Sequence, residues 1–378
     1  MTDKIKQIMQ KKDQARIKNS LKSKEKTSNL TKAQKNILNR KSLNPTKKVL
    51  FLIKLLINLI LVLSMVSLIN CQRELRFNSS FIIIKLNTSS YFLSESFLSL
   101  PDKVYIDNVE QERNKWENKY INISSKYQAI KLEWNDKLLS TSKMFMDLKQ
   151  VYEVDLSGFD SSFVTDTSYM FKGCDFILSI NFNGFTTSSV KNMQAMFYWM
   201  GSIGSIDVSH FDTSQVTDMS LLFNKCGSLN HIDVSNFNTS SVTSMAAMFG
   251  DSGFLFLNLS NFDTRKVQNM ESMICYCRHL TSVDISSFDT SSCGSFLYMF
   301  SHSTSLKSLN LSHFDTSRAG HLIGMFLYCE SLEVLDISSF KTGHMWSFWD
   351  MFNGCKKITS INLDNFDTTN IVNMAQMF

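Results

Sequence analysis

The sequence contains very little proline: Pro45 and Pro101 are the two prolines among 378 residues. Proline cannot donate a backbone hydrogen bond to a sheet, so its absence from residues 102–378 permits an uninterrupted ladder of strands there. The chain also has no Gly-rich phosphate loop, and no serine or cysteine nucleophile stands in a recognisable pattern with a base. We therefore expect no enzymatic activity and no cofactor.

Phe, Tyr and Trp are absent from residues 1–48, which are strongly basic. This stretch carries 15 Lys or Arg against three acidic residues, a net charge of +12, whereas the rest of the chain carries 24 basic and 31 acidic residues, a net charge of −7. A nucleic-acid-binding arm would use aromatic side chains for base stacking, so we expect no nucleic acid partner. The composition predicts a disordered arm over residues 1–48.

A long apolar run follows the basic arm, over residues 49–69 (VLFLIKLLINLILVLSMVSLI). A helix of this length would be about 31 Å long, enough to cross a bilayer core of roughly 30 Å. The basic side of such a segment stays in the cytoplasm. The sequence therefore predicts a single-pass signal anchor in membrane lipid, with a cytoplasmic N-terminus and extracellular later residues. A cleaved form, a form lipidated at Cys71 and a buried soluble helix are the alternatives.

A repeat of 26 residues dominates the rest of the chain. A phenylalanine closes each repeat, and the spacing is broken once, by a step of 25 between Phe249 and Ile274, which replaces the phenylalanine. A fixed period of this length is typical of proteins built from stacked repeats. The closing phenylalanines are Phe145, Phe171, Phe197, Phe223, Phe249, Phe300, Phe326, Phe352 and Phe378.

Each repeat has two apolar patterns. Ile232 and Val234 alternate with polar residues, as in a half-buried strand. Val242, Met245 and Phe249 have the spacing of one helical face. The polar residues between the two patterns suit the start of a helix, where a side-chain oxygen caps free N–H groups.

These patterns predict an α/β fold, a leucine-rich-repeat-like parallel β/α solenoid of about nine 26-residue units over residues 138–378. We expect the array to be truncated at its C-terminus, because Phe378 stands at a position that a following strand should bury. Residues 72–137 are out of phase with the repeats and are expected to form a β-rich N-terminal cap, with an independent ligand-binding module as the alternative. Strands are predicted in this region at 81–86, 103–106 and 130–134.

The repeats resemble a known family. The stretch from Phe211 to Cys226, FDTSQVTDMSLLFNKC, follows the pattern F-D-T-S-x-V-T-x-M-x-x-M-F-x-x-C, with Leu222 at the second Met. This pattern is similar to the BspA-like surface leucine-rich repeats, a 26-residue surface-protein repeat that includes a mycoplasma-type domain of unknown function. The resemblance covers residues 138–378. It implies a displayed surface protein that binds other macromolecules, and it implies no catalytic residues.

One position of the repeat marks a candidate binding surface. Its residues in successive repeats would form a polar column when the repeats stack. Between two strand apolar positions every repeat has Asp or Asn, which would point away from the core. Such a ladder on the strand face suits a polar recognition surface or weak calcium sites. Alternatively, the column keeps the face soluble with amides pairing along it, and a second acidic column, which includes Asp212 and Asp263, caps helices. The candidate binding residues are Asp207, Asp233, Asn258, Asp284, Asn310 and Asp336.

Five cysteines share one position of the repeat. The same position holds Met200 and Leu148 elsewhere, which indicates an apolar site and buried free thiols. Cys275 and Cys277 give C-x-C without a second pair at zinc-finger spacing, so no metal site is predicted. The five cysteines are Cys174, Cys226, Cys277, Cys329 and Cys355.

The sequence thus predicts a membrane-anchored cell-surface repeat protein that binds an extracellular protein or a glycan through the strand face of the array. Outward strand residues such as His231, Lys307 and Glu333 differ between repeats, which permits specific recognition. The alternative is a passive structural or antigenically variable surface-coat protein without a defined ligand.

Overall fold

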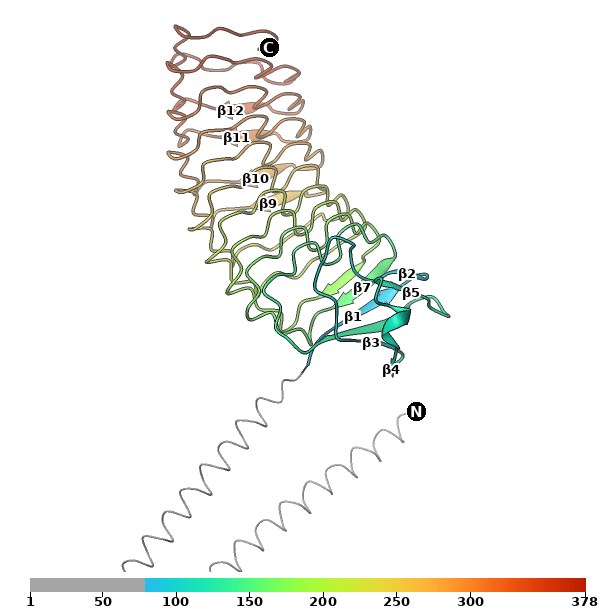
Figure 1. Cartoon of the computed structure of the whole chain (residues 1–378). Helices are drawn as coiled ribbons and strands as arrows, with labels where there is room; N and C mark the ends of the chain where they lie inside the picture. The colour runs from blue at the N-terminus through green and yellow to red at the C-terminus, as the bar shows by residue number, and fades with distance from the viewer. Residues whose placement is uncertain (1–78) are drawn as a thin grey trace, which may run out of the picture. The chain divides into compact units, whose positions relative to one another are not determined.

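A six-stranded sheet opens the part of the chain that this computed structural model describes, residues 79–378 (Figure 1). Its strands stand in the order β4-β3-β6-β1-β7-β8. They are β1 (Ser80–Leu86), β3 (Lys103–Ile106), β4 (Val109–Glu110), β6 (Gln128–Trp134), β7 (Val151–Asp155) and β8 (Ser179–Asn181). The strands predicted at 81–86, 103–106 and 130–134 are confirmed as β1, β3 and β6.

Alternating burial explains these strands. Ile82, Ile84 and Leu86 of β1 are buried, and the residues between them are half-buried. This period of two is the one that a strand with a single covered face requires. The same segment contains the strand pair β2 (Ser90–Tyr91) and β5 (Tyr120–Ile121) and the 3-10 helix η1 (Arg113–Lys115). Residues 72–78 of the predicted cap lie outside the described residues.

The N-terminal strands are hydrogen-bonded to the first repeat. Strand β1 pairs antiparallel with β7, whereas β7 pairs parallel with β8 of the next repeat. Phe81 N–H also donates to Gly158 O at 2.9 Å. The sheet therefore changes at β7 from antiparallel pairing to the parallel stacking of the repeats.

Later repeats lie one above another toward the C-terminus (Figure 1). Equivalent residues of neighbouring repeats form parallel bridges, in an unbroken series from Ser140 to Ser295. Short strands add two parallel pairs, β9 with β10 and β11 with β12. These strands are β9 (Phe256–Asn258), β10 (Ser282–Asp284), β11 (Ser308–Asn310) and β12 (Val334–Asp336).

The predicted fold class, an α/β leucine-rich-repeat-like β/α solenoid, is wrong. Residues 79–378 contain no α-helix and only small sheets. In the stretch predicted to be helical, every second N–H donates to the repeat that follows. Ala247 N–H bonds Glu271 O at 2.7 Å, and Phe249 N–H bonds Met273 O at 3.0 Å. An α-helix would direct those N–H groups to carbonyls four residues earlier in the same segment, so contact between repeats supplies the bonds that the prediction assigned to a helix.

Left-handed residues fix this backbone geometry. Ala247 has φ 53° and Asp251 has φ 51°, and L-residues with positive φ cannot continue a right-handed helix. Because most of these residues are not glycine, the sequence carries no signal for them. The position of Ala247 is also left-handed in the other repeats, at Lys143, Tyr169, Ala195, Leu221, Ser272, Tyr298, Gly324, Asp350 and Gln376.

The closing phenylalanines form two stacks in the core, one on each side of Ile274. The rings of Phe171 and Phe197 lie 6.0 Å apart at an interplanar angle of 2°, and the later repeats continue the same stacking. Val242 and Met245 are also fully buried. The apolar spacing therefore identified buried residues correctly, because a helix and a stacked turn can both bury positions i and i+3.

The single repeat of 25 residues is shortened in a turn. In most repeats the next apolar residue stands three residues after the cysteine position. In this repeat Ser252 occupies the cysteine position, and Phe254 follows two residues later. The intervening Gly253 donates its N–H to Cys226 O of the previous repeat at 3.2 Å. A Cβ on Gly253 would lie 2.3 Å from Gly227 O, so only glycine fits there. The parallel bridges continue across this repeat.

The expected localisation, a single-pass cell-membrane protein with extracellular repeats, needs correction. Within residues 79–378, no helix has both the length and the apolar character required to cross a bilayer. The predicted arm at 1–48, the predicted anchor at 49–69 and Cys71 lie outside the described residues.

Candidate functional site

The six residues predicted to form a binding surface occupy one position on successive repeats. Asn258, Asp284, Asn310 and Asp336 are the last residues of β9 to β12. Asp207 and Asp233 stand at the same position of two earlier repeats. Asp284 and Asp336 are half-buried and the other four are exposed. All six side chains therefore lie on the strand face and not in the core.

Each of the six side chains caps the turn that follows it. Its Oδ1 atom accepts the backbone N–H of the residue two positions on, at 3.0 to 3.1 Å. At Asp207 the Ser209 hydroxyl also donates to Oδ1, at 2.7 Å. Both bonds lower the pKa of Asp207, because they favour the ionised carboxylate. The bond from the Ser209 hydroxyl has the larger effect and the bond from the Ser209 N–H the smaller. The pKa values of Asp233, Asp284 and Asp336 are lowered by the same causes.

Amides and carboxylates are neighbours along parts of this column. Asn258 is the register partner of Asp284, and the next strand pair repeats this arrangement. Nearer the start of the array, Asn181 Nδ2 donates to Asp155 Oδ1 at 3.0 Å. An amide beside a carboxylate avoids the repulsion of two like charges, so the column also has a structural role.

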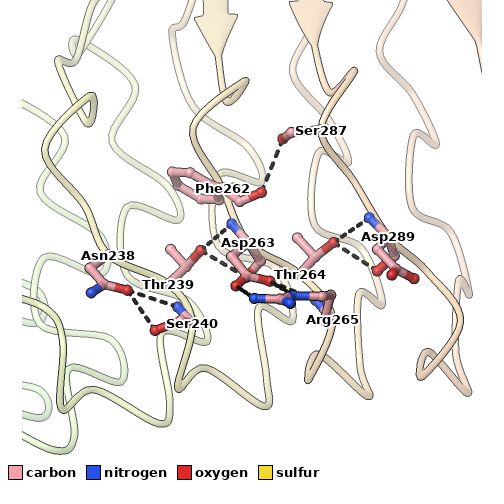
Figure 2. Close-up of polar contacts among 9 residues, drawn as sticks. All are labelled: Asn238, Thr239, Ser240, Phe262, Asp263, Thr264, Arg265, Ser287 and Asp289. Carbon is pink, nitrogen blue, oxygen red and sulfur yellow. Dashed lines mark hydrogen bonds and ion pairs between the residues drawn. The ribbon is translucent and has the colours of Figure 1, made fainter.

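The second acidic column caps turns as well. Asp212 Oδ1 accepts the Ser214 N–H at 3.0 Å, and Asp263 binds the Arg265 side chain at 2.6 Å in addition to its N–H (Figure 2). The prediction that these side chains accept a backbone N–H at the start of a chain segment is confirmed. The segment is a turn, however, and not a helix.

A recess interrupts the strand face where β1 meets the repeats. It is a cavity of ≈ 560 Å³, lined by Ile83 and Lys85 of β1, by residues of β7 and β8, and by Asp207 and His210 of the following repeat. Of the six predicted binding residues, Asp207 lines this recess and the other five do not. No local sequence pattern indicates the recess, because it depends on the pairing of β1 with β7, two strands that are far apart in the chain.

The recess is acidic. Lys85 Nζ forms an ion pair with Glu153, whereas Asp155 and Asp207 form no ion pair with a cation in the described part of the chain. His210 Nε2 lies 3.0 Å from Phe182 O. Ile83 and Ile180 are half-buried and line the same space. The recess therefore combines an apolar wall with two carboxylates that no lysine or arginine neutralises.

A threonine column lies buried beside the second acidic column (Figure 2). Thr264 Oγ1 donates to Asp289 O at 2.8 Å and accepts the Asp289 N–H at 2.9 Å. The sequence carries a signal for this ladder, a Thr or Ser directly after the acidic position in every repeat, but from the sequence alone these residues are expected to cap helices. Equivalent hydroxyls donate to the next repeat from Ser161, Thr187, Thr213, Thr239, Thr290, Thr316 and Thr342.

The cysteine position holds free thiols that are buried or half-buried. Cys226 Sγ donates to Phe197 O of the previous repeat at 3.1 Å. Burial raises the pKa of Cys226 to about 12 and that of Cys355 to about 11. A reactive cysteine needs an accessible thiolate, so these thiols pack the core. No group of three His, Cys, Asp or Glu side chains within residues 79–378 is placed to hold a metal ion.

Comparison with known proteins agrees with the repeat structure. Five overlapping stretches match the family described as Mycoplasma protein of unknown function, DUF285: residues 117–205, 176–283, 200–309, 252–359 and 295–378. Together these stretches cover well over half of the chain, and each takes in several 26-residue units. No curated protein and no solved structure matches the chain. The repeats that stack between β7 and the last residue thus identify the chain as a member of the Mycoplasma protein family of unknown function, DUF285.

Proposed function

We propose that the repeat array is a binding module that recognises another protein or a glycan through its strand face. The observation that carries this proposal is the recess at the start of that face, where a cavity of ≈ 560 Å³ and several charged side chains coincide. Ligand sites are typically concave, with an apolar lining and a few fixed polar groups.

Side chains elsewhere on the strand face support the same proposal. The position two residues before the Asp or Asn column differs between repeats, which have His231, Phe256 or Val334 there. Phe256 is 46% exposed and Val334 is 64% exposed. Stacking depends on the threonine and phenylalanine columns and not on these residues. Variable side chains on a constant scaffold are typical of the binding surfaces of repeat proteins.

The likeness of the repeats to BspA-like surface repeats is a further argument for macromolecular binding. The turns of this chain differ from the strand-and-helix unit of a leucine-rich repeat, so the proposal depends on the strand face and its recess.

Binding of the full chain to peptide and glycan arrays tests this function. One variant carries an alanine at each of three strand-face positions, and a matched control carries alanine at three exposed aromatic positions outside the strand face. We expect the first variant to lose at least tenfold in affinity for array ligands that lie along this part of the strand face, roughly 1.4 kcal/mol or more, and the control to bind as the unmodified chain does. The two sets are His231→Ala, Phe256→Ala, Val334→Ala and Trp199→Ala, Tyr328→Ala, Trp346→Ala.

Two outcomes would contradict the proposal. If the control variant loses binding, the binding site lies outside the strand face. Failure of the unmodified chain to bind either array would favour a passive structural protein, for which the ladders between repeats are sufficient.

A further inference from the structure

We infer that the recess at the start of the strand face receives a basic side chain, arginine or lysine, from a peptide segment of a protein partner. This inference rests on the proposed function and narrows it, because it selects a protein over a glycan and assigns one contact to one place in the array.

Two carboxylates in the recess are held in fixed positions. Asp155 Oδ1 accepts the Ser157 N–H at 2.9 Å and the Asn181 amide at 3.0 Å. Asp207 Oδ1 accepts the Ser209 N–H at 3.0 Å and the Ser209 hydroxyl at 2.7 Å. In both residues these bonds use Oδ1, so Oδ2 is left as an acceptor. Since the carboxylates are already oriented, a ligand cation need not order them.

The net charge of the recess selects the sign of the ligand. Lys85 is held by Glu153, so the pair contributes no net charge. Asp155 and Asp207 then leave a charge of about −2 at a concave site, where field lines concentrate. An anionic group would be repelled, whereas a guanidinium binds carboxylates through charge-assisted and often bidentate hydrogen bonds.

The apolar lining selects a long side chain over a small cation. Ile83 of β1 lines the recess and is the register partner of Asp155, so apolar surface lies directly beside this carboxylate. Arginine and lysine bury an aliphatic stem along such a surface while the charged end meets an acceptor.

The same lining disfavours a sugar. Sugars usually pack against the open face of an aromatic ring, and the phenyl ring of Phe182, which borders the recess, is buried at 3% exposure. The polar contacts of the recess can be made by a peptide without such a ring.

The test uses the full chain and two fluorescein-labelled hexapeptides, one with a central arginine and one with glutamine in its place. Fluorescence anisotropy at low salt measures their affinities, because screening weakens exposed charge contacts. We expect the arginine peptide to bind the unmodified chain. The double variant Asp155→Asn with Asp207→Asn should bind this peptide with about tenfold lower affinity. Asparagine keeps the Oδ1 acceptor, so the turns remain capped. The matched control is Asp289→Asn with Asp367→Asn, which removes two charges from the second acidic column, where each Oδ1 also caps a turn, and it should change the affinity by less than about twofold.

A third variant distinguishes the sign of the ligand charge. Lys85→Gln releases Glu153 and makes the recess more negative, so it should tighten the arginine peptide by about threefold. Weaker binding in this variant, equal binding of the two peptides, or an equal loss in the matched control would each overturn the inference.

Maltotriose provides the competing outcome. If this neutral sugar binds and depends on Asp155 and Asp207, the inference fails and the proposed function stands with a glycan as ligand. If array ligands bind the strand face without dependence on these two residues, the proposed function stands and the recess is not their site. If nothing binds the strand face, both fail together.

Discussion

The threonine ladder predicts an unusual order of stability among variants at one buried position. Thr264 is 1% exposed, and its hydroxyl satisfies both the N–H and the C=O of Asp289. Valine has nearly the same shape, so Thr264→Val leaves no cavity but deprives two backbone groups of their partner. An unsatisfied buried group costs about 1–3 kcal/mol, and we expect the free energy of unfolding to fall by about 2–4 kcal/mol.

Thr264→Ser is the informative comparison. Serine keeps both hydrogen bonds and removes one methyl group, which costs about 1 kcal/mol. The first repeat already has serine at this position: Ser161 Oγ donates to Thr186 O at 2.9 Å and accepts the Thr186 N–H at 2.7 Å. We therefore expect the less apolar serine variant to be more stable than the valine variant.

Urea unfolding followed by circular dichroism measures this order, and hydrogen exchange at the Asp289 amide reports the ladder bond directly. Thr359→Val, at an exposed position outside the ladder, is the control and should leave the unfolding midpoint nearly unchanged. A valine variant as stable as the unmodified chain, with Asp289 still protected, would refute the role given to the hydroxyl.

Three further predictions follow from single contacts. Gly324→Ala should destabilise the chain by about 1–3 kcal/mol in thermal unfolding, because Gly324 has φ 57° and its Cβ would lie 2.2 Å from the Tyr298 ring. Hydrogen bonds, first of all the one from the Ser317 hydroxyl, lower the pKa of Asp315 to about 2. The ionised Asp315 therefore stabilises the fold fully above about pH 4, and this stabilisation is lost as the pH falls toward 2. Ser317→Ala should raise the pKa of Asp315 in an NMR titration. Cys226, whose pKa is raised to about 12 by burial, should resist iodoacetamide at pH 8 until the chain is unfolded, as mass spectrometry of the alkylated protein would show.

Side-chain patterns in the sequence identified what is buried but not how the backbone is bonded. Met245, Met248 and Phe249 are buried as their spacing predicted. Their backbone groups bond to the next repeat, and spacing within one repeat holds no information about that partner. Ala247 has a left-handed backbone without being glycine, so the usual sign of a broken helix was missing.

The candidate site was predictable in part. The position of Asp207 on the strand face follows from its place between two strand apolar residues. Its neighbours Lys85 and Glu153 do not, because an antiparallel strand pair brings them together across 68 residues of sequence. Local patterns show which face a residue occupies, whereas a recess depends on which distant strand lies beside it.

The shortened turn at Gly253 has a consequence for how such a chain can change during evolution. Recombination between two copies of the repeat that adds or removes a whole 26-residue unit leaves every inter-repeat ladder aligned, so longer and shorter arrays can fold with the same contacts. A change of one residue is tolerated at this turn because a glycine brings the two backbones together there. Elsewhere the same change would offset the threonine, phenylalanine and bridge columns at once, so gene length in this family should vary in whole repeats and at this turn.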